Sequence, residues 1–208
     1  VEDLEFQLVD KWIYSRLNQT IETVNNKLSN QALDDGAKAI YEFLRGDFCD
    51  WYVEIAKTRL YNSEDIKNKQ TAQYVLWNIL EKGLKLLHPF MPFMTEEIWQ
   101  KLGANGETIM LSEFPIYNEK EVDLVSENSF AYLQELVGAV RNIRAEMNVS
   151  PAKPITLVLK TEDKTELETI TGNKEFLKSL VKAENLEFGT ELVKPEGAGF
   201  RVANRTEV

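Results

Sequence analysis

The chain has 208 residues, enough for one large domain or two small ones. Hydrophobic residues make up 43% and charged residues 28%, which is the balance of a soluble protein with a packed core. The formal net charge of −10 argues against a general affinity for nucleic acid, so any RNA-binding surface has to be local.

The sequence shows no sign of a membrane segment or of secretion. Its longest apolar stretch, near residues 86–94, is too short and too interrupted by prolines to span a bilayer. The first residues lack the pattern of a signal peptide, and the missing initiator Met suggests an excised fragment. The single cysteine, Cys49, and the single histidine, His88, exclude an internal disulfide and argue against a zinc site. We therefore expect a cytoplasmic protein that holds no metal.

Amphipathic helices are predicted along the first 148 residues. The first, about 4–28, is indicated by apolar residues at helical spacing: Ile13, Leu17, Ile21, Val24 and Leu28. A second helix is predicted from about Asp34 to Leu60, and a third, with Ser63 as its N-cap, up to Leu87. The segment 88–92 has to interrupt this helix, because its two prolines lack backbone donors and clash with the preceding turn.

The remaining elements follow from turn residues and changes of period. Pro92 opens a short helix over 93–102 that Gly103 ends, residues 104–118 form an extended connection with 108–111 strand-like, and another helix spans about 122–147. The proline-rich stretch 148–154 marks a boundary between a bundle at 1–148 and a smaller domain at 149–208. In the latter, 155–160, 185–188 and 200–203 are predicted as strands and 163–182 as a helix. The predicted fold is mainly α, an antiparallel helix bundle followed by a small α+β segment.

Motifs of a catalytic centre are missing from the sequence. It has neither a phosphate-cradling loop nor the glycine pattern of a dinucleotide site. His88 lacks a neighbouring nucleophile, which favours packing or capping over acid–base catalysis. Cys49 lies on a helix expected to face the core, where a small buried side chain is a better interpretation than a nucleophile. The chain is therefore expected to bind a partner, with no catalytic residue and no cofactor of its own.

Two further groups on the second helix have a structural and a functional interpretation. Asp47 and Asp50, three residues apart, resemble a two-carboxylate site, but a solvated or salt-bridged helix face is the favoured interpretation. The aromatic residues have a helical period, so most of them are expected in the core, with stacking on nucleobases as the alternative. They are Phe43, Phe48, Trp51 and Tyr52.

Several blocks of sequence are distinctive and occur in a fixed order. They are residues 10–17 (Asp-Lys-Trp-Ile-Tyr-Ser-Arg-Leu), 47–54 (Asp-Phe-Cys-Asp-Trp-Tyr-Val-Glu), 56–60, and 86–100, which contains His-Pro-Phe-Met-Pro-Phe. Together they closely resemble the anticodon-binding region of bacterial-type valyl-tRNA synthetases, and residues 143–147 and 150–154 look like its later part. The resemblance covers about residues 1–160. It implies an antiparallel bundle of the class Ia type.

The resemblance also implies a function. Such an enzyme activates valine with ATP and transfers it to tRNA, but its His-Ile-Gly-His and Lys-Met-Ser-Lys-Ser motifs are absent from this chain. This chain would be a non-catalytic fragment, with ATP bound only by the full-length enzyme. Its expected partners are the anticodon stem-loop of valine tRNA and the rest of the synthetase chain. A stand-alone acidic helical scaffold for another protein is the alternative, which the charge favours and the sequence blocks do not.

The RNA-binding residues implied by the resemblance lie on the first two helices and the turn between them. Basic groups would contact phosphates, while stacking and hydrogen bonds would recognise unpaired bases. The candidates are Lys11, Arg16, Asn30, Gln31, Leu33, Lys38 and Arg45. Arg16 lies inside the first matching block and is the leading candidate, with a salt bridge to a bundle carboxylate as the alternative.

One departure from the family weakens this assignment. Family members often carry an aromatic-Arg-Phe sequence in the turn before the second helix, where this chain has Gln31-Ala32-Leu33. Both stacking and a phosphate contact are therefore weaker here if that turn touches the anticodon. Other basic residues are fallback candidates, with solvated charges as the alternative: Lys57, Arg59, Arg141, Arg144 and Lys153.

Overall fold

The computed structural model describes residues 4–62, 65–103 and 106–208. Its internal packing divides the chain into two compact units, Val1–Glu127 and Asn128–Val208, and each is described by itself. The composition change at 148–154 follows the end of the long helix α6 (Leu124–Glu146), whereas the division between the units lies near the start of that helix. The predicted N-cap Ser63 lies outside the described residues.

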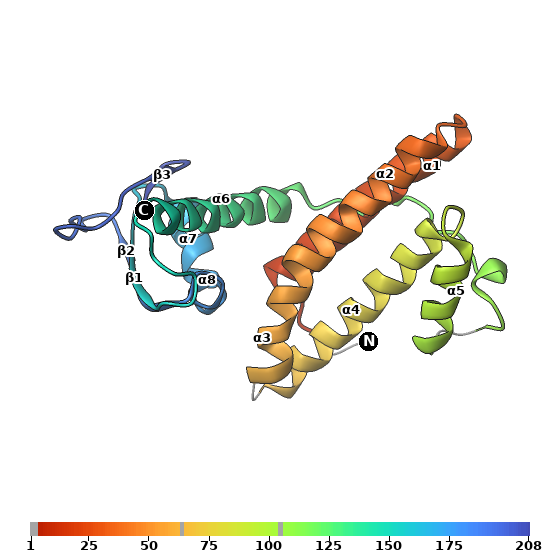
Figure 1. Ribbon diagram of the computed structural model, residues 1–208, viewed down its shortest axis with the longest axis horizontal. Coiled ribbons are helices and arrows are strands. Elements are labelled where there is room, and N and C mark those ends of the chain that lie inside the picture. The colour runs from red at the N-terminus through yellow and green to blue at the C-terminus, as the bar shows by residue number, and fades with distance from the viewer. Residues whose placement is uncertain (1–3, 63–64, 104–105) are drawn as a thin grey trace. The chain divides into compact units, whose positions relative to one another are not determined.

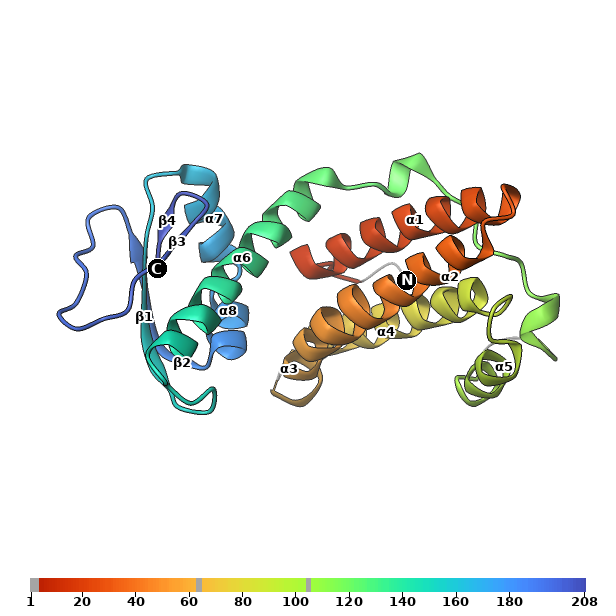
Figure 2. The ribbon, with the colours of Figure 1, turned by 45° about the horizontal axis from the view of Figure 1, so that its top comes forward.

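The first unit is a bundle of helices, as predicted (Figure 1). Its elements are α1 (Leu8–Ser29), α2 (Leu33–Glu42), a π-helix (Phe43–Val53), α3 (Glu54–Asn62), α4 (Ile66–Leu87) and α5 (Pro92–Lys101). Figures 1 and 2 show α1, α2 and α4 side by side, and each packs against the other two. The predicted stripe of α1 is confirmed: Ile13, Leu17, Ile21 and Val24 are buried in this core.

The predicted second helix is continuous, but its hydrogen bonds change along its length. Between α2 and α3 the chain forms a π-helix, in which backbone bonds run from residue i to i+5. Phe43, Phe48 and Tyr52 are buried, which confirms that most of the aromatic group belongs to the core. The wider turn changes which residues share a face, and Cys49 is exposed. The prediction of a buried cysteine, made from α-helical spacing, is therefore wrong.

The connection after α5 differs from the prediction in one place. Residues 109–111 form a short 3-10 helix and not a strand. The Glu96 carboxylate accepts hydrogen bonds from Thr108 Oγ1 at 2.7 Å and from the Ile109 backbone at 3.2 Å. In a strand, the Ile109 backbone amide would need a hydrogen-bond acceptor on a neighbouring strand. Here Glu96 accepts that hydrogen bond, which favours the 3-10 helix.

The second unit is a small mixed sheet with helices, as the predicted α+β segment. It contains part of α6, β1 (Ile155–Lys160), α7 (Lys164–Gly172), α8 (Lys174–Val181), β2 (Ala183–Gly189), β3 (Val202–Ala203) and β4 (Thr206–Glu207). The strand order is β2-β1-β4-β3, with β1 and β2 parallel and the other neighbours antiparallel. The predicted helix over 163–182 is broken at Asn173, which follows Gly172. The strand β4 was not predicted.

The helix α6 belongs to the packing of the second unit. The rings of Phe130 on α6 and Phe176 on α8 stack with centroids 6.1 Å apart, and the Tyr132 hydroxyl lies 2.6 Å from Thr206 Oγ1. Burial of the Tyr132 hydroxyl raises its pKa to about 12. Within the described part of the chain, none of the helices combines the length and the apolar character that crossing a bilayer requires.

Candidate nucleic-acid interface

The α1–α2 turn and the α4–α5 turn lie at the same end of the bundle (Figure 1), and the second of them packs against the beginning of α2. Gly36, in the first turns of α2, makes their approach possible. A Cβ atom at this position would lie only 3.2 Å from the Phe90 ring of the α4–α5 turn. We call residues 30–33 and 91–94 the bundle tip.

The α1–α2 turn is held by its own backbone bonds and presents short side chains outward. Asn30 caps α1 and donates its side-chain amide to the Asn26 carbonyl at 2.8 Å. Gln31 has a φ of 59°, in the left-handed region that few non-glycine residues adopt. Gln31 is exposed, and Leu33 leaves 57% of its surface in contact with solvent. The side chains of Gln31 and Leu33 are therefore available to a ligand at this turn.

The α4–α5 turn is fixed by the single histidine. His88 ends α4, and its Nδ1 lies 2.7 Å from Oγ1 of the buried Thr95. Thr95 Oγ1 also donates to the Met91 carbonyl at 2.9 Å. This confirms a capping role for His88. Pro92 is the first residue of α5, and the ring of Phe93 directly after it is 91% exposed.

A second exposed group begins on α2 and ends at Arg45, in the first turn of the π-helix. Lys38, Tyr41 and Arg45 are spaced by three and four residues, so they lie on the same side of the helix. The Tyr41 ring is 55% exposed, and its hydroxyl accepts a hydrogen bond of 3.2 Å from Arg45. Lys38 Nζ lies 3.8 Å from Glu42. We call these residues the α2 flank, which combines two cations with an exposed aromatic ring.

Arg16, the leading candidate from the sequence, contacts carboxylates of the bundle. Its Nε donates to Asp47 Oδ2 at 2.9 Å, and its Nη1 lies 3.9 Å from Glu127. Burial raises the pKa of the Asp47 carboxyl, and the nearby guanidinium of Arg16 acts in the opposite direction. Asp47 is therefore part of a salt-bridged helix face, as predicted.

The candidate residues do not form a single cluster. Asn30, Gln31 and Leu33 lie at the bundle tip, and Lys38 follows within about two helical turns. Lys11 is exposed near the opposite end of α1, and at about 1.5 Å per residue it lies roughly 28 Å along the helix from Asn30. Asn30, Gln31 and Leu33 therefore lie together at the α1–α2 turn, whereas Arg45 lies about 18 Å along the helix from Leu33, two residues from the Asp47 that contacts Arg16.

The fallback cations include two that are buried. Arg59 forms a salt bridge of 2.7 Å with the fully buried Asp10, which also accepts a hydrogen bond from the Tyr52 hydroxyl. Arg144 donates to the carbonyls of Ser150, Lys153 and Val181. These guanidinium groups are neither solvated nor available to RNA, so both interpretations of Arg59 and Arg144 were wrong. They hold helices and loops together instead.

The residues that sequence reasoning missed are Tyr41, Met91 and Phe93. The position of Tyr41 between Lys38 and Arg45 was a signal for an exposed face of the helix. The exposure of Phe93 depends on the tertiary position of the α4–α5 turn, which no local pattern specified. Across the described ranges, no three His, Cys, Asp or Glu side chains gather closely enough to hold a metal ion.

Comparison with known proteins agrees with the sequence blocks. The family model described as the anticodon-binding domain of tRNA ligase matches residues 10–159. The valine–tRNA ligase of Fusobacterium nucleatum is 54% identical over 207 residues, which cover 99% of this chain and 23% of the relative. The valine–tRNA ligases of Synechocystis and Aquifex aeolicus are each 41% identical, over 92% and 96% of this chain and 21% and 18% of those relatives.

The chain spans about a quarter or less of the length of the curated relatives it matches. The family model covers the whole bundle, α6 and almost all of β1. The chain therefore belongs to the anticodon-binding domain family of tRNA ligases, in the form carried by valine–tRNA ligases.

Proposed function

We propose that this chain is the tRNA-binding part of a valine–tRNA ligase, and that its bundle tip and α2 flank hold the anticodon stem-loop of valine tRNA. The observation that carries this proposal is the 91% exposure of Phe93, an aromatic residue at the start of α5, just after the turn whose Phe90 ring packs against α2 at Gly36. Exposed aromatic rings are the surfaces on which unpaired bases stack. Membership of an anticodon-binding family supports an anticodon loop as the ligand of that surface.

Each group at the tip has a role that follows from its chemistry. Phe93 offers a stacking face, and Leu33 an apolar contact for a second base. The Gln31 side chain has both a donor and an acceptor, so it can pair with the edge of an unstacked base. Phe93 thus supplies the aromatic surface that the α1–α2 turn of this chain lacks. Lys38 and Arg45 are placed to contact phosphates next to the loop, with Tyr41 between them.

Phosphate attraction is weak at this end of the bundle. Lys27 forms a salt bridge of 2.6 Å with Asp35, and this bond holds the pKa of the Asp35 carboxyl below its usual range. The formal net charge of the chain is −10. Selectivity therefore rests on contacts with bases, while the cations of the α2 flank set the position of the stem.

In the longer enzyme the contribution of this chain is positional. A catalytic domain outside the chain would activate valine with ATP, and the bundle would hold the anticodon end so that the acceptor end reaches it. Binding energy spent far from the reacting atoms lowers the entropic cost of bringing them together. We expect the enzyme to act in the cytoplasm, with the remainder of the synthetase and valine tRNA as its partners.

A filter-binding titration with valine tRNA and an unrelated tRNA tests this function. We expect retention of valine tRNA at low salt, and a loss of about 1–3 kcal/mol for Phe93→Ala, the value of a base–aromatic stack. Ile116→Ala is the matched control, since Ile116 is another highly exposed apolar residue of the same unit. Nuclease footprinting should show protection of the anticodon loop. Equal retention of both tRNAs, or equal effects of the two substitutions, would contradict the proposal.

A further inference from the structure

The strand β1 is paired along only one of its edges. All of its residues pair with β2, whereas on the other side Lys160 alone pairs, with Glu207 of β4. The amides of Ile155 and Thr161 donate to carbonyls on the β2 side. Because amides alternate in direction along a strand, those of Thr156 and Val158 point toward the other edge. Along 155–159 this edge has no neighbouring strand among the described residues, and such edges readily accept another strand.

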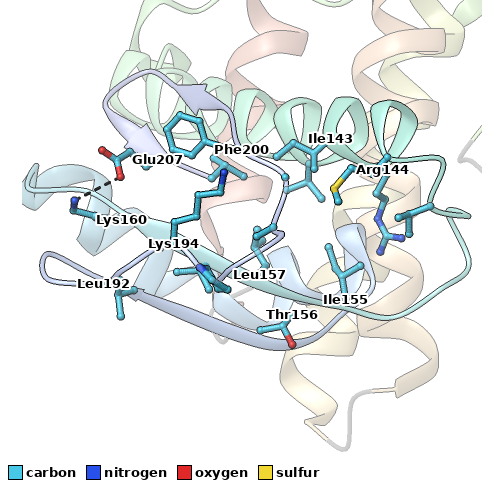
Figure 3. Close-up of a pocket in the computed structure, with 18 of the residues that line it drawn as sticks. Ile143, Arg144, Ile155, Thr156, Leu157, Lys160, Leu192, Lys194, Phe200 and Glu207 are labelled. Carbon is cyan, nitrogen blue, oxygen red and sulfur yellow. Dashed lines mark ion pairs between the residues drawn. The ribbon is translucent and has the colours of Figure 1, made fainter.

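A cavity of about 370 Å³ lies along this edge (Figure 3). Ile143 of α6 and Met147 directly after this helix form one wall, and Lys194 and Phe200 come from the segment between β2 and β3. Val208 lies at the end of the cavity where β4 stops. The cavity therefore combines an apolar lining with unpaired backbone groups of β1.

The register of β4 shows which side chains a further strand would bury. Glu207 is opposite Lys160, so Val208 is opposite Leu159, and both Val208 and Leu159 are buried. Thr206, on the same face of β4 as Val208, contacts Tyr132 of α6. Continuing past Val208, every second residue would face Leu157 and then Ile155, against the apolar wall of α6.

We propose that this groove is a strand-docking site for an extended segment of the longer synthetase polypeptide, antiparallel to β1 and in line with β4. The favoured segment is the stretch that follows Val208 in the full-length enzyme, because β4 runs into the groove and needs no turn to continue. About five residues at roughly 3.4 Å each reach Ile155. The segment has apolar side chains at alternate positions, and its carbonyls accept from Thr156 and Val158.

A peptide strand fits the groove better than a small apolar molecule does. A strand satisfies the backbone groups of β1 along 155–159 that face no other strand in the described part of the chain. A small apolar ligand fills the volume and leaves those groups unsatisfied. The docked strand would also lengthen β4 along β1 and tie the second unit to the rest of the enzyme. This inference does not depend on tRNA binding.

Amide hydrogen exchange tests the proposal. We expect the Thr156 and Val158 amides to exchange at least about tenfold more slowly in the full-length synthetase than in the 208-residue chain, equivalent to about 1.4 kcal/mol in opening free energy. The Leu157 and Leu159 amides, which point to β2, are the internal references. Equal exchange of Thr156 and Val158 in both proteins would overturn the proposal. Slowing that appears only after valine tRNA is added would overturn it too, by assigning the groove to RNA.

A matched pair of tails tests the predicted facing of the strand. The 208-residue chain is extended by Thr-Val-Thr-Val-Thr-Val or by Val-Thr-Val-Thr-Val-Thr, which differ only in phase. The first tail places its valines on the side of Leu157 and Ile155, and it should slow exchange at Thr156 and Val158 by at least about tenfold relative to the second. Equal effects of the tails, or none, would overturn the assignment. Filter binding of the same proteins reports on tRNA separately.

Discussion

Replacement of Arg16 by alanine separates a structural from an RNA-binding role of this residue. The substitution removes the hydrogen bond of 2.9 Å to Asp47 and the longer contact with Glu127. The Arg16 side chain is 38% exposed, so solvent screens the pair and its contribution is well below that of a buried salt bridge. We expect the free energy of unfolding to fall by about 1 kcal/mol at neutral pH.

The pH dependence follows from the carboxyl that is left behind. Burial already raises the folded-state pKa of Asp47, and loss of the guanidinium raises it further. When the pKa of a carboxyl group is higher in the folded than in the unfolded state, its charged form destabilises the fold at higher pH. Protonation of the carboxylate removes this loss of stability as the pH falls. The difference in stability between wild type and Arg16→Ala should therefore shrink from neutral pH toward about pH 4.

Urea denaturation at both pH values, with Asp47→Ala and the double variant, measures the coupling between the two residues. Filter binding under conditions where all proteins are folded gives the second readout. We expect Arg16→Ala to change the affinity for valine tRNA by less than about threefold, or about 0.6 kcal/mol. A coupling energy near zero together with a loss of affinity above tenfold would show that Arg16 contacts RNA and that this reasoning is mistaken.

The remaining predictions concern a buried ion pair, a thiol and salt. Arg59→Leu leaves the fully buried Asp10 without its cation, so it should lower the free energy of unfolding in chemical denaturation by about 3–5 kcal/mol. The control Lys57→Leu removes an exposed ion pair and should lower it by less than about 1 kcal/mol. Partial burial and the nearby Asp50 raise the pKa of the Cys49 thiol. Alkylation of Cys49 should therefore be slower than that of a free thiol at pH 8, and its rate should increase further above pH 9. Alkylation that requires unfolding of the protein would contradict the exposure of Cys49. If Lys38 and Arg45 make the main phosphate contacts, a plot of log affinity against log salt should have a slope shallower than about −2. A slope steeper than about −5 would require a cationic surface not described above.

The sequence was most informative where hydrophobic period alone determines the structure. The stripe of α1 and the strand β1 were predicted correctly, because burial of alternating or helically spaced residues dominates their stability. Pro92 and Gly103 located α5 through local backbone effects, since proline fixes φ at the first helical position and Gly103 adopts the left-handed φ of 68° after the helix. These elements need no tertiary information.

The errors arose where tertiary contacts or unusual hydrogen bonds determine the local structure. An α-helical period put Cys49 in the core, but the π-helix gives a different set of residues to each face. The strand β4 is only two residues long and is defined by its pairing with β1 and β3, which a local pattern does not show. For Arg59, the buried Asp10 lies forty-nine positions away in sequence, so the pair could not be recognised from spacing.

The candidate site was partly predictable, because the family resemblance pointed to the α1–α2 turn, although not to the exposed Phe93. The α1–α2 turn follows from sequence, but its partner turn comes from a distant segment that Gly36 allows to approach. Cations such as Lys27, Lys85 and Lys101 form salt bridges with carboxylates. Their contribution to a positive electrostatic potential that could attract RNA is therefore small. If the bundle binds RNA as proposed, contacts with bases would then provide most of the affinity, and Lys38 and Arg45 would add only a few phosphate contacts. Unpaired bases occur at the loop of a stem-loop, and an exposed ring at the end of a bundle is suited to that loop and not to a duplex.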